Sequence, residues 1–188
     1  MRSEKDISGI VLAGGKSRRM GRDKALIVLK NRTFLEHVVC ALKPMVDEIF
    51  IVSDNPEHQI ENFSRVPDKF VDGGPIAGIY TGLIHSKSEN NIVLSCDVPL
   101  ISSSVLEILL DNNEDNYDVV QLKDQENYYP LIALYKKRIA PYFLTLLNKG
   151  ERKLMHAVSG LNVKTICIEK AQQELLKNVN TISDLKSI

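Results

Sequence analysis

The chain has 188 residues, of which 44% are hydrophobic and 26% are charged, and its 24 basic residues balance its 24 acidic ones. This length and composition are typical of one globular domain. A formal net charge of zero leaves no overall basic field to attract nucleic acid or an anionic membrane surface. No apolar run approaches the ~20 residues of a membrane-spanning helix.

The N-terminal segment and the cysteines predict the compartment. Residues 1–8 are polar and charged, unlike a secretory signal peptide. The three cysteines, Cys40, Cys96 and Cys167, are widely spaced and form no C-x-x-C pair, so a disulfide framework or structural zinc site is not expected. Apolar runs around Cys40 and Cys167 predict core positions, and Cys96 should be a packed small hydrophobe. We therefore expect the reducing cytoplasm as the location.

Apolar runs alternate with helical patterns along the chain. The predicted strands span Ile7–Leu12, Glu48–Ser53, Asn91–Ser95, Tyr117–Leu122, Leu131–Tyr135 and Val163–Ile168. The predicted helices span Thr33–Leu42, Ile76–His85, Ser102–Leu110, Arg138–Leu147 and Ser183–Lys186. This alternation favours an α/β fold with a mainly parallel sheet. The turn between the fourth and fifth strands is too short for a helical crossover, so these two should be antiparallel or strongly bent.

Local signals predict how some helices begin. Thr33 and Glu36 have the spacing of a capping box. Pro75 suits the first turn of the second helix, and a run of serines from Ser102 offers caps for the third.

The segment from Leu12 to Lys24 has the composition of a phosphate-binding loop. Gly14 and Gly15 directly follow the first predicted strand, and clustered Lys and Arg residues come next. Glycines let an anion approach the backbone N–H groups closely, and the basic side chains supply the opposing charge. This chemistry suits the phosphate chain of a nucleoside triphosphate. The alternative is a surface turn with solvated basic residues.

Spacing excludes two better-known phosphate loops. A P-loop, G-x-x-x-x-G-K-[ST], would need its first glycine at position 10, which is Ile10. The dinucleotide fingerprint G-x-G-x-x-G fails because Gly14 and Gly15 are adjacent and no third glycine follows at the right place.

Two further segments follow predicted strands, and open α/β sheets bind ligands at the carboxyl ends of their strands. Asp97 follows one strand and suits Mg²⁺, which takes one or two carboxylates besides phosphate oxygens and water, although it could merely cap a turn. The turn at 73–78 could let a base or ribose approach the backbone, with Asp68 or Asp72 as a polar reader. Its alternative role is a tight helix start.

A third segment lies near the C-terminus. Asn178 and Asn180 alternate about Val179, so both could face a ligand from an extended segment. The alternative is that Asn180 or Thr181 caps the last short helix.

The four histidines show no metal or triad spacing, and no G-x-S-x-G nucleophile motif occurs. We expect His37, His58 and His85 on the surface or on helix faces. His156 follows the basic pair Arg152-Lys153 and could lie nearer a second substrate.

Together these segments resemble the nucleotidyltransferases, most closely the molybdenum cofactor guanylyltransferases. The family's L-A-G-G-x-S-x-R-M-G-x-D-K-A stands here as residues 12–25, its G-P-L-A-G as 74–78, its C-D-x-P as 96–99 and its N-x-N-T as 178–181. Order and spacing match over almost the whole chain, from residue 7 to 186. The chain departs from the family at Ser53, where Asn is frequent and Asn55 follows two residues on.

Two more departures fall in the later half of the chain. Tyr129 stands where the family often has His, and Ile182-Ser183 stands where Pro-Glu commonly follows the N-x-N-T segment.

The resemblance implies a Rossmann-like three-layer sandwich with one antiparallel strand. It also implies transfer of GMP from GTP to molybdenum-molybdopterin, with release of pyrophosphate and with Mg²⁺ as cofactor. We expect one domain, residues 1–188, whose N-terminal half binds GTP and whose C-terminal half binds molybdopterin. Proteins of molybdenum insertion and molybdoenzyme maturation are the implied partners.

The expected site residues fall into three groups. GTP should be bound by Leu12, Ala13, Gly14, Gly15, Lys24, Asp68 and Asp97, and Mg²⁺ by Asp97. Catalytic charge stabilisation should come from Lys24, Asp97 and Arg19. Molybdopterin should be bound by Arg152, Asn178 and Asn180. The alternatives are a nucleotidyltransferase that uses CTP on molybdopterin or acts on a sugar or polyol phosphate, and a nucleotide-binding protein without turnover.

Overall fold

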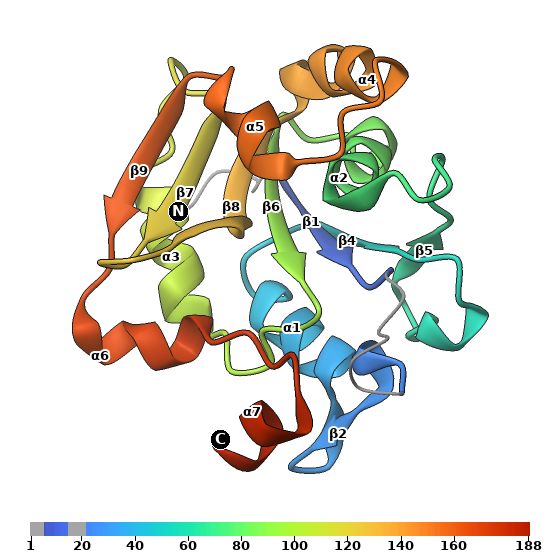
Figure 1. Ribbon diagram of the computed structural model, residues 1–188, viewed down its shortest axis with the longest axis vertical. Helices are drawn as coiled ribbons and strands as arrows, with labels where there is room; N and C mark the ends of the chain where they lie inside the picture. Colours follow the sequence, from blue (N-terminus) through green and yellow to red (C-terminus); the bar gives the residue numbers. More distant parts are fainter. Residues whose placement is uncertain (1–5, 15–21) are drawn as a thin grey trace.

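The computed structural model describes residues 6–14 and 22–188. Its centre is a seven-stranded sheet with the order β5-β4-β1-β6-β8-β7-β9, covered by helices on both faces (Figure 1). The strands are β1 (Ile7–Leu12), β4 (Glu48–Val52), β5 (Ser64–Val66), β6 (Asn90–Ser95), β7 (Val119–Lys123), β8 (Tyr128–Lys136) and β9 (Val163–Cys167). A small hairpin of β2 (Val28–Leu29) and β3 (Arg32–Thr33) stands apart from this sheet.

The sheet is parallel except at one strand. β1 pairs in parallel with β4 and β6, and the pairs β4–β5 and β7–β9 are parallel as well. β8 runs antiparallel to both of its neighbours, β6 and β7, and a bulge between Gln121 and Leu122 interrupts its register with β7. The predicted mainly parallel α/β fold, with one antiparallel strand after a short turn, is therefore confirmed.

The helices form the two outer layers. They are α1 (Phe34–Leu42), α2 (Gly74–His85), α3 (Ser103–Asp111), α4 (Ala140–Asn148), α5 (Leu154–Ser159), α6 (Lys170–Gln173) and α7 (Ile182–Lys186). The short 3₁₀ turns are η1 (Lys24–Leu26), η2 (Pro56–His58), η3 (Lys137–Ile139) and η4 (Glu174–Leu176). α1 and α3 cover one face of the sheet, whereas α2, α4 and α5 cover the other.

Both faces of the central strands are buried, which explains why they read as continuous apolar runs. In β1, Val11 packs into the core under α1 and α3, while Ile10 and Leu12 pack into the core under α2. All three side chains are at most 9% exposed. Successive side chains of a strand point to opposite faces, so one apolar run supplies both cores.

The predicted caps are confirmed for the first helix and corrected for the third. Thr33 Oγ1 accepts from the N–H of Glu36 at 3.2 Å, and the Glu36 carboxylate accepts from the N–H of Thr33 at 2.6 Å. Pro75 occupies the first turn of α2 as expected. Ser102 makes no side-chain cap to α3, and its hydroxyl bonds to Ser104 instead.

The cysteine predictions were partly wrong. Cys40 and Cys167 are exposed, because Cys40 lies outside the buried face of α1 and Cys167 ends β9, an edge strand of the sheet. Cys96 is buried as expected, and burial raises the pKa of its thiol to about 12. The Cys96 thiol is therefore a packing group rather than a reactive one.

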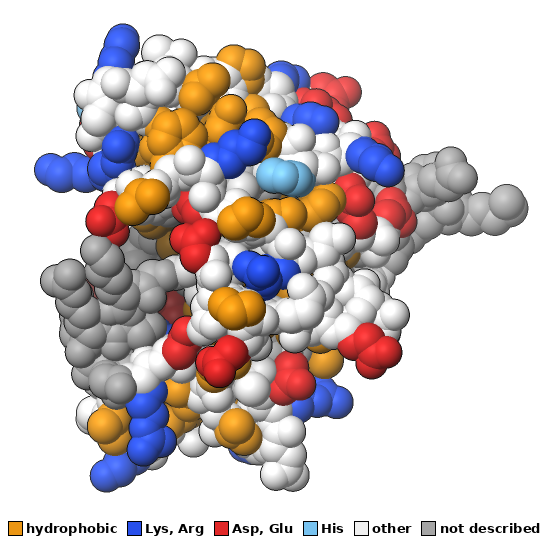
Figure 2. All heavy atoms as spheres, turned by 90° about the vertical axis from the view of Figure 1, so that its right-hand side faces the viewer, with side chains coloured by type: hydrophobic (Ala, Val, Ile, Leu, Met, Phe, Trp, Pro, Cys, Tyr) orange, Lys and Arg blue, Asp and Glu red, His pale blue; other side chains and the backbone are white. Residues whose placement is uncertain are grey.

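The surface carries mixed charge. On the face seen in Figure 2, acidic and basic side chains are interspersed among apolar ones. Within residues 6–14 and 22–188, no helix is both long and apolar enough to cross a membrane.

Candidate functional site

The carboxyl ends of three neighbouring parallel strands bring the predicted segments together. The N–H of Ala13 bonds to the carbonyl of Val52 at 3.1 Å, and the N–H of Cys96 bonds to the carbonyl of Leu12 at 3.0 Å. Pairing therefore continues one residue past β1 and β6. The glycine segment, which begins at Ala13, and the segment that begins at Cys96 thus leave the sheet side by side. This is the edge where open α/β sheets bind ligands.

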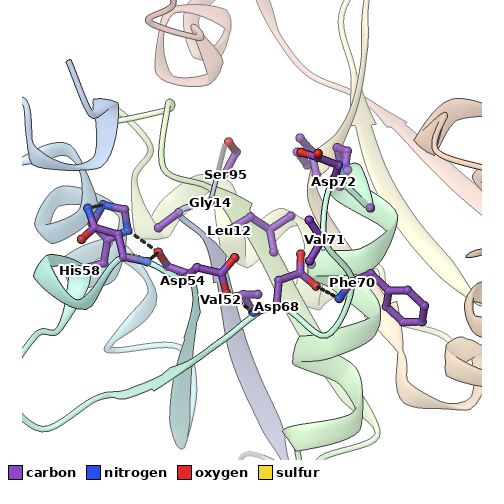
Figure 3. Close-up of a pocket in the computed structure, with 18 of the residues that line it drawn as sticks. Leu12, Gly14, Val52, Asp54, His58, Asp68, Phe70, Val71, Asp72 and Ser95 are labelled. Atoms are coloured by element: carbon purple, nitrogen blue, oxygen red, sulfur yellow. Dashed lines mark hydrogen bonds between the residues drawn. The ribbon is translucent and has the colours of Figure 1, made fainter. Parts of the chain in front are cut away.

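A cavity of about 760 Å³ opens at this edge (Figure 3). Its wall comes from the end of β1, the segment after β4, the loop before α2 and the start of α2. Asp54 and Asp68 point into it from two different loops. Among the described residues, the predicted GTP contacts Leu12, Ala13, Gly14 and Asp68 all line it.

Asp68 is held in place by its neighbours. Its Oδ1 accepts from the N–H of Phe70 at 3.2 Å and from the hydroxyl of Thr81 at 3.0 Å. Despite these two bonds, burial raises the pKa of the Asp68 carboxyl above its ordinary value. A fixed, partly desolvated carboxylate at a cavity wall is suited to accept hydrogen bonds from a ligand's N–H groups.

Two glycines at the cavity differ in what they require. Gly74 has φ +66°, and a Cβ there would lie 3.3 Å from the carbonyl oxygen of Arg152. The chain path itself therefore requires glycine at 74. A Cβ on Gly14 would find Val52 O as its nearest atom among the described residues, at 3.9 Å, which is ordinary contact. Packing against the described residues therefore does not require glycine at 14. A close approach of a ligand to the backbone would explain glycine at this position.

Lys24, Asp97 and Asn180 meet next to the cavity. Lys24 Nζ lies 3.8 Å from Asp97 Oδ2 and donates a short hydrogen bond to Asn180 Oδ1. The side chains of Lys24 and Asp97 are each 18% exposed, so water reaches both but does not fully surround them. Asp23, which lines the cavity, is the residue before Lys24, and Ser95, which also lines it, lies two residues before Asp97. One ammonium, one carboxylate and one amide thus meet beside the cavity, behind residues that line it.

The C-terminal segment reaches this site through its backbone. Val179 is buried, and its N–H bonds to the carbonyl of Asp97 at 2.8 Å. The predicted alternation holds, because Asn178 and Asn180 flank this inward residue. The expected cap is also present: Thr181 Oγ1 accepts from the N–H of Asp184 and begins α7. Asn180 is thus not the cap, and its side chain is available to Lys24.

Arg152 contacts the start of α2 at Gly74, which lines the cavity. Its carbonyl faces Gly74, and its guanidinium donates to the carbonyls of Leu147 and Glu151 at 3.0 and 2.8 Å. His156 bonds to Glu151 and is exposed. The structure therefore places the Arg152 backbone at the start of α2 while its side chain binds the end of α4.

Tyr129, which stands where the family often has His, has a local partner. Its hydroxyl donates to Asp124 at 2.5 Å. This bond is the main cause that lowers the pKa of the Asp124 carboxyl to about 2, while burial raises the pKa of Tyr129 to about 12.

The expectation for His58 was wrong. It is only 1% exposed, and it lines the cavity together with Ser53 and Asn55. Its Nε2 lies 2.9 Å from Asp23 Oδ2 and its Nδ1 lies 2.6 Å from Ser53 Oγ. Residues 53–58 (S-D-N-P-E-H) contain both Ser53 and His58. The other partner, Asp23, is 35 residues away in the chain, so no local pattern could have predicted this contact. His37 and His85 match the expectation on helix faces.

Two predicted site residues, Gly15 and Arg19, lie outside the described residues. Among those that are described, the arrangement combines a cavity that could hold a nucleoside with a cation and a carboxylate beside it. Such a set can hold a phosphate chain and neutralise its charge.

Comparisons with known proteins agree with this arrangement. Residues 9–163 match the family model described as the MobA-like NTP transferase domain. The chain is 31% identical to a probable molybdenum cofactor guanylyltransferase of Flavobacterium johnsoniae, over 97% of this chain and 96% of the relative. It is 35% identical to a protein of the same name from Carboxydothermus hydrogenoformans, over 95% and 92%.

A solved structure is also similar. Molybdopterin-guanine dinucleotide biosynthesis protein A from Archaeoglobus fulgidus superposes with a TM-score of 0.81 at 27% identity, covering 96% of this chain and 95% of that one.

Proposed function

The chain belongs to the MobA-like NTP transferase family, and we propose that it is a molybdenum cofactor guanylyltransferase, which transfers GMP from GTP to molybdenum-molybdopterin. The observation that carries this proposal is the meeting of Lys24, Asp97 and Asn180 beside the cavity. Full-length relatives that share one name support GTP over CTP and molybdopterin over a sugar phosphate.

The cavity is the proposed nucleoside site. Asp68 offers a carboxylate that its neighbours hold in place. Guanine presents adjacent N–H groups, and such a carboxylate can accept hydrogen bonds from them. The backbone at Leu12, Ala13 and Gly14 forms the adjoining wall. The glycine segment would then carry the phosphates, with the backbone N–H groups of Gly14 and Gly15 facing them.

The donor set fits Mg²⁺ better than a metal that needs a full protein cage. Mg²⁺ is held by one or two carboxylates together with phosphate oxygens and water, and Asp97 supplies one partly exposed carboxylate at the strand end. No group of three or more acidic, His or Cys side chains forms a metal cluster within the part of the chain that the structure describes. When bound at Asp97, the ion would polarise the phosphate oxygens of GTP.

The proposed reaction needs no side-chain nucleophile. The terminal phosphate oxygen of molybdopterin attacks the α-phosphorus of GTP, the new P–O bond forms, and the bond to the β-phosphate oxygen breaks to release pyrophosphate. Lys24, with Arg19 and the glycine amides, would stabilise the negative charge that gathers on the leaving pyrophosphate. The attacking oxygen is already anionic, so the chain's task is to position two phosphates and neutralise their charge.

Molybdopterin is proposed to bind on the side of the later chain segments. Asn178 and Asn180 would offer amides to the pterin ring, and Arg152, whose carbonyl faces Gly74 at the cavity, would supply a cation for its phosphate. Because Asn180 also bonds to Lys24, the GTP half and the molybdopterin half would touch at this amide. We further propose that the enzyme works in the cytoplasm and passes its product to proteins of molybdoenzyme maturation.

Pyrophosphate release tests the proposal. Purified protein is mixed with Mg²⁺, molybdenum-molybdopterin and either GTP, ATP or CTP, and GTP should give the fastest release. Asp97→Asn keeps the size of the side chain and removes its charge, so turnover should fall by ~10²–10³ while the melting temperature stays close to that of the wild type. A preference for CTP would contradict the guanylyltransferase assignment. Turnover by Asp97→Asn near the wild-type rate would make Asp97 a turn residue only.

A further inference from the structure

His58 is a buried side chain that the proposed chemistry does not use. It ends the 3₁₀ turn η2, it is 1% exposed, and both of its ring nitrogens have partners. The Asp23 carboxylate can only accept, so Nε2 of His58 donates to Asp23 Oδ2 across 2.9 Å. Nδ1 lies 2.6 Å from Ser53 Oγ, and this hydroxyl oxygen accepts from the N–H of Asn55 at 3.0 Å.

Asp23 links this histidine to the loop that carries Lys24. Its Oδ2 is shared by His58 and by the side-chain amide of Asn55, at 2.9 and 3.0 Å. Its other oxygen, Oδ1, accepts from the N–H of Ala25 at 3.1 Å and thereby caps η1. The first residue of η1 is Lys24. The same carboxylate therefore bonds to two residues that line the cavity, His58 and Asn55, and to the turn that holds Lys24.

We propose that His58 is a positioning residue: by fixing Asp23 it sets the orientation of η1 and keeps Lys24 where it meets Asp97 and Asn180. This proposal rests on the proposed function, in which Lys24 stabilises charge on the phosphates. Misplacing a reacting or stabilising group by about 1 Å can cost ~10²-fold in rate. Asp23 would keep Asn55 and Ala25 without His58, but it would lose the donor that comes from the buried side.

Two substitutions at one position separate the two ring nitrogens. In His58→Gln the side-chain amide reaches the place of Nε2 and can still donate to Asp23. In His58→Asn the shorter amide reaches only the place of Nδ1, so it can serve Ser53 but not Asp23. Both variants remove the same ring, and any general loss of packing should be similar in the two. His85→Asn, at an exposed position on α2, is the control for purification and assay.

The expected result is a difference in kcat without a matching difference in stability. His58→Asn should lose about tenfold or more in kcat for pyrophosphate release, with little change in the KM for GTP. His58→Gln should recover most of that rate, and the two melting temperatures should agree. Equal kcat in the two variants, or a rate that simply follows the melting temperature, would overturn the proposal.

A second readout does not depend on turnover. Lysines labelled with ¹³C-methyl groups give NMR signals, and the Lys24 signal is assigned with Lys24→Arg. This signal should move in His58→Asn and stay near its wild-type position in His58→Gln. If the wild-type protein releases no pyrophosphate, the proposed function fails, and the Lys24 signal still decides the positioning role. A signal that moves equally in both variants contradicts it.

Discussion

At the scale of one residue, Asp68, which we propose as the reader of the base, shows how a carboxylate at a cavity wall can oppose stability. Burial raises the pKa of its carboxyl above 3.8 although Phe70 and Thr81 both donate to it. The folded state therefore binds a proton more tightly than the unfolded state. The resulting cost to stability is fully present above the folded pKa and disappears as the pH falls below 3.8. Solvent reaches this side chain and moderates this cost to stability.

We predict that Asp68→Asn stabilises the free protein and weakens GTP binding. The amide oxygen can keep both hydrogen bonds while the charge is removed, so the melting temperature at pH 7 should rise. The gain should shrink at pH 4 in the same thermal unfolding assay. Loss of a charge-assisted bond to the base should weaken GTP binding by ~1.5–3 kcal/mol, measured by calorimetry. A variant that binds GTP as tightly as the wild type would exclude Asp68 as a reader of the base.

At the scale of elements, glycine in α2 serves close packing, whereas we propose that glycine after β1 serves the approach of a ligand. A Cβ on Gly82 would meet three side-chain atoms of Ile10, the nearest at 2.4 Å, and Ile10 is fully buried in β1. The helix therefore lies directly on the strand at this glycine. Gly14 follows the same strand but leaves ordinary van der Waals space for a Cβ among the described residues.

This contrast predicts opposite outcomes for two alanine substitutions. Gly82→Ala gains helix propensity of about 1 kcal/mol but overpacks the contact with Ile10 by ~1–3 kcal/mol, and overpacking should prevail because Ile10 has no exposed side to move into. Gly14→Ala should leave the free energy of unfolding unchanged or raise it by up to ~1 kcal/mol, and should weaken GTP binding. Urea unfolding and GTP calorimetry on both variants measure this. Loss of stability without loss of binding in Gly14→Ala would assign that glycine to the fold.

The same scale explains which elements the sequence predicted. Strands such as β1 and β6 are buried on both faces, so continuous apolar runs marked them within a residue or two. β5 is only Ser64–Val66 and the strands of the β2–β3 hairpin have two residues each, too few for any period to be visible. α5, with six residues, was missed for the same reason. Cys40 was misplaced because an apolar stretch of helix does not reveal by itself which side faces out.

At the scale of the whole molecule, residues far apart in the sequence meet at one edge of the sheet. Motif order and strand ends predicted the loops of the candidate site, since carboxyl ends of parallel strands converge. The contacts within the site were not predictable: the partners Lys24 and Asn180 are 156 residues apart, and Asp23 and His58 are 35 apart. Such pairs depend on the lengths and paths of loops, which carry no periodic pattern.

The bond between Lys24 and Asn180 yields a prediction about the two halves of the site. The C-terminal segment is anchored through the buried Val179, so removing one flanking amide should leave the fold intact. Asn180→Ala should weaken molybdopterin binding and also lower kcat, because Lys24 loses a partner. Asn178→Ala is the matched variant on the other side of Val179, and it should weaken molybdopterin binding with little effect on kcat at saturation. GTP affinity should change far less than molybdopterin affinity in both variants, because neither amide touches GTP in the proposed arrangement.

Affinities for GTP and molybdopterin, measured on the same preparations, decide between the two assignments. If Asn180→Ala lost GTP affinity alone, the amide would belong to the nucleotide half, and molybdopterin would have to bind elsewhere along the cavity. If both variants kept both affinities and lost only kcat, the segment would act through Lys24 rather than by touching the pterin. The position of Val179 between the two amides makes the comparison direct, since its N–H bond to Asp97 holds the backbone at the same place in either variant.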